Sequence, residues 1–307
     1  MKFNMAKVPN HVLWWLLGTV IYFSWYVFVI GLREDHVRAY IFLSLIFLFW
    51  KTGRKYLNGL TGMLLYIVAY DSLRVFPNYS FFEIHTEDVY NAEKFLFGIA
   101  SNGTHITPNE YFAERTAVWM DIISGFAYLS WLPIPLAISI YLFIKNRKDM
   151  IIFVILLALT NLFGVMGYYL FPTAPPWYIE EYGFVIDFSI GGQTAGLGRF
   201  DEFFGYPVFE NMFSKNSSIF AAIPSIHSAD PFISFLALRL LKYKKLAAFM
   251  LFNSILIWVA VVYSGHHYMI DVLDGIFVAA LAYVVYLWLA NKEGIKDKID
   301  KYAALIT

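Results

Sequence analysis

The chain contains no cysteine among its 307 residues, and this absence removes several kinds of chemistry at once. Disulfide bonds, thiolate nucleophiles and cysteine-ligated zinc or iron–sulfur sites are excluded. Charge is scarce as well, because Asp, Glu, Lys and Arg make up only 15% of the residues, against about a quarter in soluble domains. Lys and Arg together number 23, and so do Asp and Glu. With no excess of either sign to attract an anionic or cationic partner, nucleic-acid binding is excluded.

Apolar residues are abundant instead, at 59% of the chain, and 20% of the residues are aromatic. This composition indicates a protein whose solvent is a lipid bilayer. The first apolar run, Val12 to Ile30, is about long enough to cross ~30 Å of hydrocarbon. Lys2 and Lys7 precede it, as in a signal peptide, but no small-x-small cleavage site follows. We therefore interpret the run as a retained first membrane span.

The distribution of apolar runs predicts an all-α polytopic membrane protein with about eight transmembrane helices. Strong runs lie near 11–31, 56–76, 119–144, 150–171, 246–264 and 268–290, and two weaker runs lie near 36–50 and 225–241. Three short loops are basic, and they contain Lys51, Arg54 and Lys55, then Lys145, Arg147 and Lys148, then Lys242, Lys244 and Lys245. If both weak runs are spans and the N-terminus is cytoplasmic, all three loops are cytoplasmic, as positively charged loops generally are.

This topology divides the chain into four parts. They are N-terminal transmembrane helices (1–76), an extracytoplasmic amphipathic segment (77–118), a catalytic transmembrane core (119–291) and a cytoplasmic tail (292–307). The segment 77–118 contains six carboxylates at partly helical spacing, which favours a solvated or interfacial helix. Within the core, 172–224 is too long for a plain connector, so we expect it to form a roof over a functional site.

Three histidines lie where chemistry is expected. His227 begins the weak run near 225–241, while His266 and His267 begin the last run, and the predicted topology places all three on one face of the membrane. His267 and Asp271 are four residues apart, so a helix would stack them on one side. A carboxylate that binds one imidazole nitrogen makes the other more basic. With His227 as the general acid, these residues predict cleavage of a phosphoester through a phosphohistidine.

A metal site is the main alternative interpretation of these side chains. His227, His267 and Asp271 would suit zinc or non-haem iron by ligand type. No third histidine-rich helix accompanies them, and the stretch Pro224-Ser225-Ile226-His227 favours anion binding at a helix N-terminus. We therefore expect no metal and no other cofactor.

Several stretches resemble a known family. Pro224-Ser225-Ile226-His227, followed by His267-xxx-Asp271-Val272-xx-Gly275, resembles two signature motifs of the type 2 phosphatidic acid phosphatase superfamily. With Pro172–Tyr178, Ala195–Asp201 and His266-His267-Tyr268 added, the chain is similar to the inositol phosphorylceramide synthases, the target family of aureobasidin A. The resemblance implies that His267 is the nucleophile, Asp271 orients it and His227 protonates the leaving group. It further implies transfer of inositol phosphate from phosphatidylinositol to ceramide or dihydroceramide, with release of diacylglycerol.

The chain departs from the phosphatase pattern at its basic residues. Phe171-Pro172 stands where phosphatases have Arg-Pro, and Ala260-Val261 stands where they have Ser-Arg. A phosphodiester has one negative charge and needs fewer cations than a monoester, and Arg199 is the expected cation. The other expected substrate-binding residues are Ser225, Tyr178, Asp201, Asp121 and His266. The last of these points elsewhere on its helix and would equally suit a plain interfacial position.

Two other functions remain open from the sequence: a lipid phosphatase of the same superfamily, and a non-enzymatic transporter or scaffold with a degenerate site. Asp71 and Arg74, three residues apart, are predicted to pair on one helix face near the outer membrane surface. The expected partners are lipid substrates, with no nucleic acid, and the sequence predicts no particular protein partner. The expected location is a bacterial inner membrane with an extracytoplasmic active site, or the lumenal face of the Golgi in a eukaryote.

Overall fold

A bundle of long helices forms the centre of the molecule in the computed structural model, which describes residues 9–306. The N-terminal residues with Lys2 and Lys7 lie outside the described residues. The bundle consists of α7 (Val118–Ser130), α8 (Pro133–Lys145), α9 (Arg147–Leu170), α13 (Ile226–Leu240), α14 (Lys244–Tyr263) and α15 (Met269–Ala290). Helix α13 packs against α9, α14 and α15. The shared core contains buried apolar side chains from these helices, among them Phe153, Leu156, Ile233, Met250 and Ala279.

Local sequence explains where these helices begin. The Asn146 side chain accepts the Lys148 backbone N–H at 3.0 Å at the start of α9, and Ser225 caps α13 in the same way. Pro133 occupies the first position of α8, where its missing N–H costs nothing. Helices α7 and α8 meet at a bend of 42° beside Trp131.

Four described helical segments are long and apolar enough to span a membrane: Asn10–Ile30, Arg147–Leu170, Lys244–Tyr263 and Met269–Ala290. The bent pair of α7 and α8 makes a fifth if it counts as one span. These segments mark the chain as an integral membrane protein. The other predicted spans form shorter helices: α2 (Glu34–Phe49), α3 (Lys51–Gly59), α4 (Thr61–Asp71) and α13. The predicted run near 56–76 is divided at Leu60 between α3 and α4. Helix length and composition support four or five spans, so the count of eight stays a prediction.

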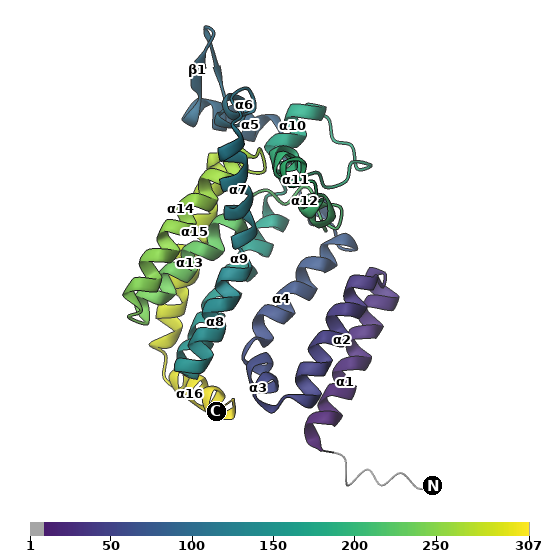
Figure 1. Cartoon of the computed structure of the whole chain (residues 1–307), viewed down its shortest axis with the longest axis vertical. Coiled ribbons are helices and arrows are strands. Elements are labelled where there is room, and N and C mark those ends of the chain that lie inside the picture. The colour runs from purple at the N-terminus through teal and green to yellow at the C-terminus, as the bar shows by residue number, and fades with distance from the viewer. Residues whose placement is uncertain (1–8, 307) are drawn as a thin grey trace.

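The remaining elements gather at the upper end of the molecule in Figure 1, apart from α16. They are α5 (Glu87–Phe97), the antiparallel hairpin β1 (Ile99–Ser101) and β2 (Thr104–Ile106), α6 (Pro108–Ala113), α10 (Pro176–Tyr182), α11 (Gly198–Phe204) and α12 (Val208–Phe213). The tight hairpin depends on Asn102 and Gly103, which both have positive φ. At the lower end, α16 (Ile295–Leu305) packs against α9.

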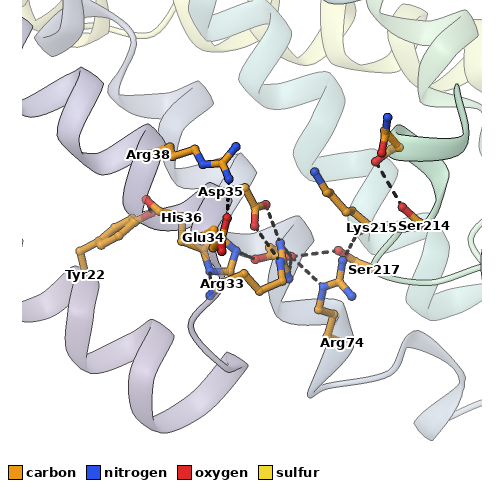
Figure 2. A network of polar contacts seen from close by, with 12 residues as sticks. Tyr22, Arg33, Glu34, Asp35, His36, Arg38, Arg74, Ser214, Lys215 and Ser217 are labelled. Carbon is orange, nitrogen blue, oxygen red and sulfur yellow. Dashed lines mark hydrogen bonds and ion pairs between the residues drawn. The ribbon is translucent and has the colours of Figure 1, made fainter. Parts of the chain in front are cut away.

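The N-terminal helices join this upper region through Asp71, at the end of α4. Its Oδ1 accepts hydrogen bonds from Arg74 Nε at 3.0 Å and from Ser217 Oγ at 3.2 Å. Its Oδ2 lies 2.9 Å from His36 Nε2, and Arg33 Nη2 lies 3.3 Å from Oδ1. The predicted pairing of Asp71 with Arg74 is confirmed. Figure 2 shows Arg33, Arg74 and Ser217 converging from the α1–α2 connection, the end of α4 and the segment 172–224. We call these contacts the Asp71 hub.

Candidate active site

Two histidines that are 40 residues apart in the sequence are in contact in the structure. His227 lies in the first turn of α13, and His267 lies in the loop directly before α15. His227 Nδ1 is 3.2 Å from His267 Nε2, and the ring centroids are 5.5 Å apart. The predicted convergence of these two imidazoles is therefore present in the fold.

Asp271 holds the second histidine from the first turn of α15. Its Oδ2 lies 3.1 Å from His267 Nδ1 and accepts the Tyr268 backbone N–H at 2.9 Å. Asp271 is fully buried, and His267 is 6% exposed. A buried carboxylate that accepts from Nδ1 fixes the imidazole tautomer and leaves the lone pair on Nε2 as the nucleophilic position.

The start of α13 is attached to α15 by backbone contacts. The Ser225 N–H donates to the Asp271 carbonyl at 3.1 Å, and the Ser225 side chain accepts the Ser228 N–H at 3.3 Å. A Cβ atom at Gly275 would lie only 2.3 Å from the Ser225 carbonyl oxygen. Glycine is therefore needed at 275 for the close approach that brings the two histidines together. The buried Ser225 side chain caps the helix, and its expected role in substrate binding stays a prediction.

Tyr128 of α7 extends the row of polar contacts. Its hydroxyl is 2.8 Å from His227 Nε2, so the groups follow the order Tyr128, His227, His267 and Asp271. If His267 Nδ1–H donates to Asp271, then His227 Nδ1–H donates to His267 Nε2 and Tyr128 O–H donates to His227 Nε2. The Trp131 ring covers His227 at a centroid distance of 4.5 Å. The contact between Tyr128 and His227 was not predicted, because the two residues are 99 positions apart in the sequence.

A second polar centre contains the expected cation. Arg199 Nε, from α11, donates to Asp121 Oδ1 of α7 at 2.6 Å, and the Tyr263 hydroxyl donates to the same oxygen at 2.8 Å. Burial lowers the pKa of Arg199, but the hydrogen bond and charge of Asp121 raise it more, so the group stays cationic. Arg199 Nη2 is buried and has no hydrogen-bond partner within residues 9–306. Asp121 thus fixes one edge of the guanidinium, while the buried Nη2 keeps an unused hydrogen-bonding capacity.

Contacts made by the roof segment connect the two centres. The Gly196 N–H donates to the Ser264 carbonyl at 2.9 Å. His266 Nε2 donates to the Thr194 carbonyl at 2.9 Å, and its ring stacks on Phe213 at 4.3 Å. His266 therefore attaches the roof segment to the loop that carries His267, and its expected role in substrate binding stays a prediction.

Tyr178 and Asp201 lie within the roof segment, and their polar atoms contact roof backbone. The Tyr178 hydroxyl donates to the Val185 carbonyl at 3.1 Å and accepts the Asp187 N–H at 2.7 Å. The Asp201 carboxylate accepts the first backbone N–H groups of α12. These contacts hold the roof in shape, and the substrate-binding roles expected for both side chains stay predictions.

The described part of the chain contains no group of three or more His, Asp and Glu side chains arranged to hold a metal ion. The geometry at His267 is that of an imidazole oriented by a carboxylate, with a second imidazole facing its free nitrogen. This arrangement suits nucleophilic attack followed by proton transfer to a leaving group.

This helical bundle with a His–His–Asp site belongs to the PAP2 superfamily, whose family model matches residues 105–285. Over 278 residues, the chain is 38% identical to the phosphoinositol dihydroceramide synthase of Bacteroides thetaiotaomicron. That alignment covers 89% of this chain and 90% of the relative.

Fungal relatives are more distant. The chain is 27% identical over 250 residues to the inositol phosphorylceramide synthase catalytic subunit AUR1 of Saccharomyces cerevisiae, covering 80% of this chain and 59% of that protein. It is 34% identical over 139 residues to the inositol phosphorylceramide synthase of Candida albicans, covering 44% of this chain and 29% of that protein. No solved structure gives a significant match. The predicted superfamily and the resemblance to inositol phosphorylceramide synthases are both confirmed.

Proposed function

We propose that the protein is a membrane phosphotransferase that moves inositol phosphate from phosphatidylinositol to ceramide or dihydroceramide and releases diacylglycerol. The observation that carries the proposal is the continuous contact from Asp271 through His267 to His227. The relatives supply the substrate class, since they are named phosphoinositol dihydroceramide synthase and inositol phosphorylceramide synthase.

In the first half-reaction, His267 Nε2 attacks the phosphorus of the donor and the bond from phosphorus to the diacylglycerol oxygen breaks. Protonated His227 gives its Nδ1 proton to that oxygen, and Asp271 stabilises the charge that develops on His267. The Tyr128 hydroxyl can keep its hydrogen bond to His227 in both protonation states, because it donates to the neutral Nε2 or accepts from the protonated Nε2.

In the second half-reaction, neutral His227 removes the proton from the primary hydroxyl of the acceptor. The resulting oxygen attacks phosphorus, and the bond to His267 Nε2 breaks. The two lipids use one site in turn, which predicts ping-pong kinetics. Arg199 compensates the single charge of the phosphodiester through its free Nη2 edge.

The test is a product assay on the full chain in phosphatidylinositol vesicles that contain dihydroceramide. We expect inositol phosphoryldihydroceramide and diacylglycerol in equal amounts, and neither product from the His267→Ala variant. Release of free inositol phosphate at saturating dihydroceramide would contradict the transferase. Release of inorganic phosphate from phosphatidic acid would support the lipid phosphatase, the second candidate within this superfamily.

We propose further that eight spans place this site on the extracytoplasmic face. The site lies at the same end as α5, α6 and the roof segment, opposite the basic loops that precede α9 and α14 (Figure 1). Single cysteines test this directly in a chain without natural ones. An impermeant maleimide added to intact cells should label exposed positions 32 and 104, and should label positions 51 and 245 only after the membrane is opened. Labelling of 104 and 245 from the same side would contradict the topology.

A further inference from the structure

The loop that carries His267 is held by residues far outside the signature motifs. Glu93, in α5, is fully buried. Its Oε1 accepts the Met269 N–H at 2.9 Å, and its Oε2 accepts the Ile270 N–H at 3.0 Å. These N–H groups belong to the first turn of α15, where no intrahelical acceptor exists and where the helix dipole favours a negative charge.

Asn109, in α6, holds the other side of the same loop. Its Nδ2 donates to the His267 carbonyl and to the Val262 carbonyl, both at 2.9 Å. It is 4% exposed. Since the His267 N–H donates to the Val261 carbonyl, both backbone polar groups of His267 have partners.

The two supports are connected to each other. The Tyr90 hydroxyl of α5 donates to Glu110 Oε1 of α6 at 2.8 Å. Glu110 also forms a capping box with Thr107, which fixes the start of α6 beside Asn109. The segment 77–118 was predicted to be a solvated or interfacial helix. In the structure it also has buried side chains that hydrogen-bond the backbone of residues 267–270.

A buried carboxylate is costly unless hydrogen bonds compensate it, and Glu93 is compensated by two backbone N–H groups. An imidazole nucleophile must stay aligned to within about half an ångström and 10–20° of its productive geometry. We propose that Glu93 and Asn109 are positioning residues that fix the backbone on both sides of His267, so that Nε2 stays aligned for attack. This proposal rests on the proposed role of His267 as nucleophile.

The charge of Glu93 provides a signature that a purely structural role lacks. Burial raises the pKa of Glu93 to about 7, the two backbone hydrogen bonds lower it, and the charge of Asp271 raises it further. The ionised carboxylate accepts both N–H groups. Protonation below about pH 7 places a hydrogen on one of the two oxygens and weakens the hydrogen bond that this oxygen accepts. Burial raises the pKa of Tyr268 far above this range, and the charges of Asp271 and Glu93 raise it further. Tyr268 therefore stays neutral between pH 6 and pH 8.

The experiment compares wild type with Glu93→Gln and with the control Glu87→Gln, which removes an exposed carboxylate from the same helix. At pH 8 we expect Glu93→Gln to lower kcat at least ~10-fold, with both lipid KM values within about twofold. The ratio of wild-type to variant kcat should shrink as the pH falls from 8 to 6, because wild type then also loses its doubly accepting carboxylate. The control should match wild type throughout.

A second variant, Asn109→Leu, keeps the volume of the side chain and removes both of its hydrogen bonds, and it should also lower kcat with little change in KM. If wild type hydrolyses the donor instead of transferring the head group, the same kcat ratios are measured on hydrolysis, so the two proposals fail separately. An unchanged kcat, a rise in KM alone, or a pH-independent ratio would overturn the positioning role. So would loss of folding in both variants, which would assign these side chains to stability.

Discussion

The C-terminal bundle and the N-terminal helix pair are held by different forces. In α9 and in α14, half of the most apolar stretch is buried inside the protein. In Asn10–Ile30 the buried share is 6%. The segment Asn10–Ile30, which is α1 (Asn10–Trp25) and the π-helical turn that follows it, instead has exposed apolar side chains such as Trp14, Val20 and Phe28. In a bilayer such surfaces gain little by associating, because lipid chains are equally apolar.

Polar contacts at the end of the N-terminal helices that adjoins the roof segment take the place of a packed core for this pair. Trp25 Nε1 donates to Ser72 Oγ at 3.1 Å, and Arg33 and His36 reach the Asp71 hub (Figure 2). We therefore expect substitutions at the bundle's active site to change the reaction, and substitutions in the Asp71 hub to change stability. The following predictions test this division, beginning with the largest effect.

The largest effect is expected at the carboxylate of the bundle. Asp271→Asn removes the charge that orients His267 and stabilises its positive form, so kcat should fall on the order of 10²- to 10⁴-fold. Head-group transfer and labelling of the protein by a labelled donor are the measurements. Asp274→Asn, three residues further along α15, is the matched control. A similar loss in that control would mean that α15, and not the His267–Asp271 contact, had been disturbed.

The next effect concerns the cation of the roof. Arg199→Lys keeps the charge but cannot hold Asp121 and the phosphate at the same time, so kcat/KM should fall roughly 10- to 100-fold. Arg115→Lys, an exposed arginine paired with Glu114, should have no effect. Full activity of Arg199→Ala would remove Arg199 from the site and leave the phosphate without this cation.

Tyr128→Phe should give a smaller loss. It removes the hydroxyl beside His227 Nε2 and keeps the ring, so proton transfer should slow by about 5- to 30-fold, as the loss of a hydrogen bond of ~1–2 kcal/mol implies. Both half-reactions should slow, since His227 serves as acid in one and base in the other. Single-turnover measurements with the donor alone separate them. Slowing of the second half-reaction only would contradict this placement of Tyr128.

Residues next to one another in sequence gave most of what could be predicted. The Asp71–Arg74 pair and the longest spans follow from helix periodicity and hydropathy, and both are present in the structure. The predicted contact between His267 and Asp271 is present too, but His267 lies in the loop before α15 and not on the helix face that the four-residue spacing predicted. The positions of the basic loops predicted that His227 and His267 lie on the same face of the membrane. They did not predict that the two imidazoles are in contact. The Arg199–Asp121 ion pair joins two residues that were expected separately at the site, but their 78-residue separation gave no sign of the contact.

The missed features depend on contacts between distant segments. Glu93 has the sequence setting of a solvated helix, and nothing near it indicates that α15 will need its carboxylate. Tyr178 and Asp201 belong to short stretches that suggested substrate binding, yet their polar atoms hold roof backbone. The run near 56–76 is strongly apolar in sequence, but the structure divides it between α3 and α4 at Leu60, and hydropathy does not indicate such a break.

The smallest effect on turnover, and the largest on stability among these variants, is expected at the Asp71 hub. Asp71→Asn leaves Arg33 and Arg74 facing a neutral amide and weakens the contact with Ser217, which should cost about 1–3 kcal/mol of stability. We expect a lower Tm in detergent and faster proteolysis near residue 217, while kcat stays within about twofold. Glu34→Gln is the control, because its ion pair with Arg38 lies at side chains that are 85% and 77% exposed and should contribute almost nothing. A loss of kcat in Asp71→Asn as large as in Asp271→Asn would show that the two regions are coupled through the roof segment, and the division between them would fail.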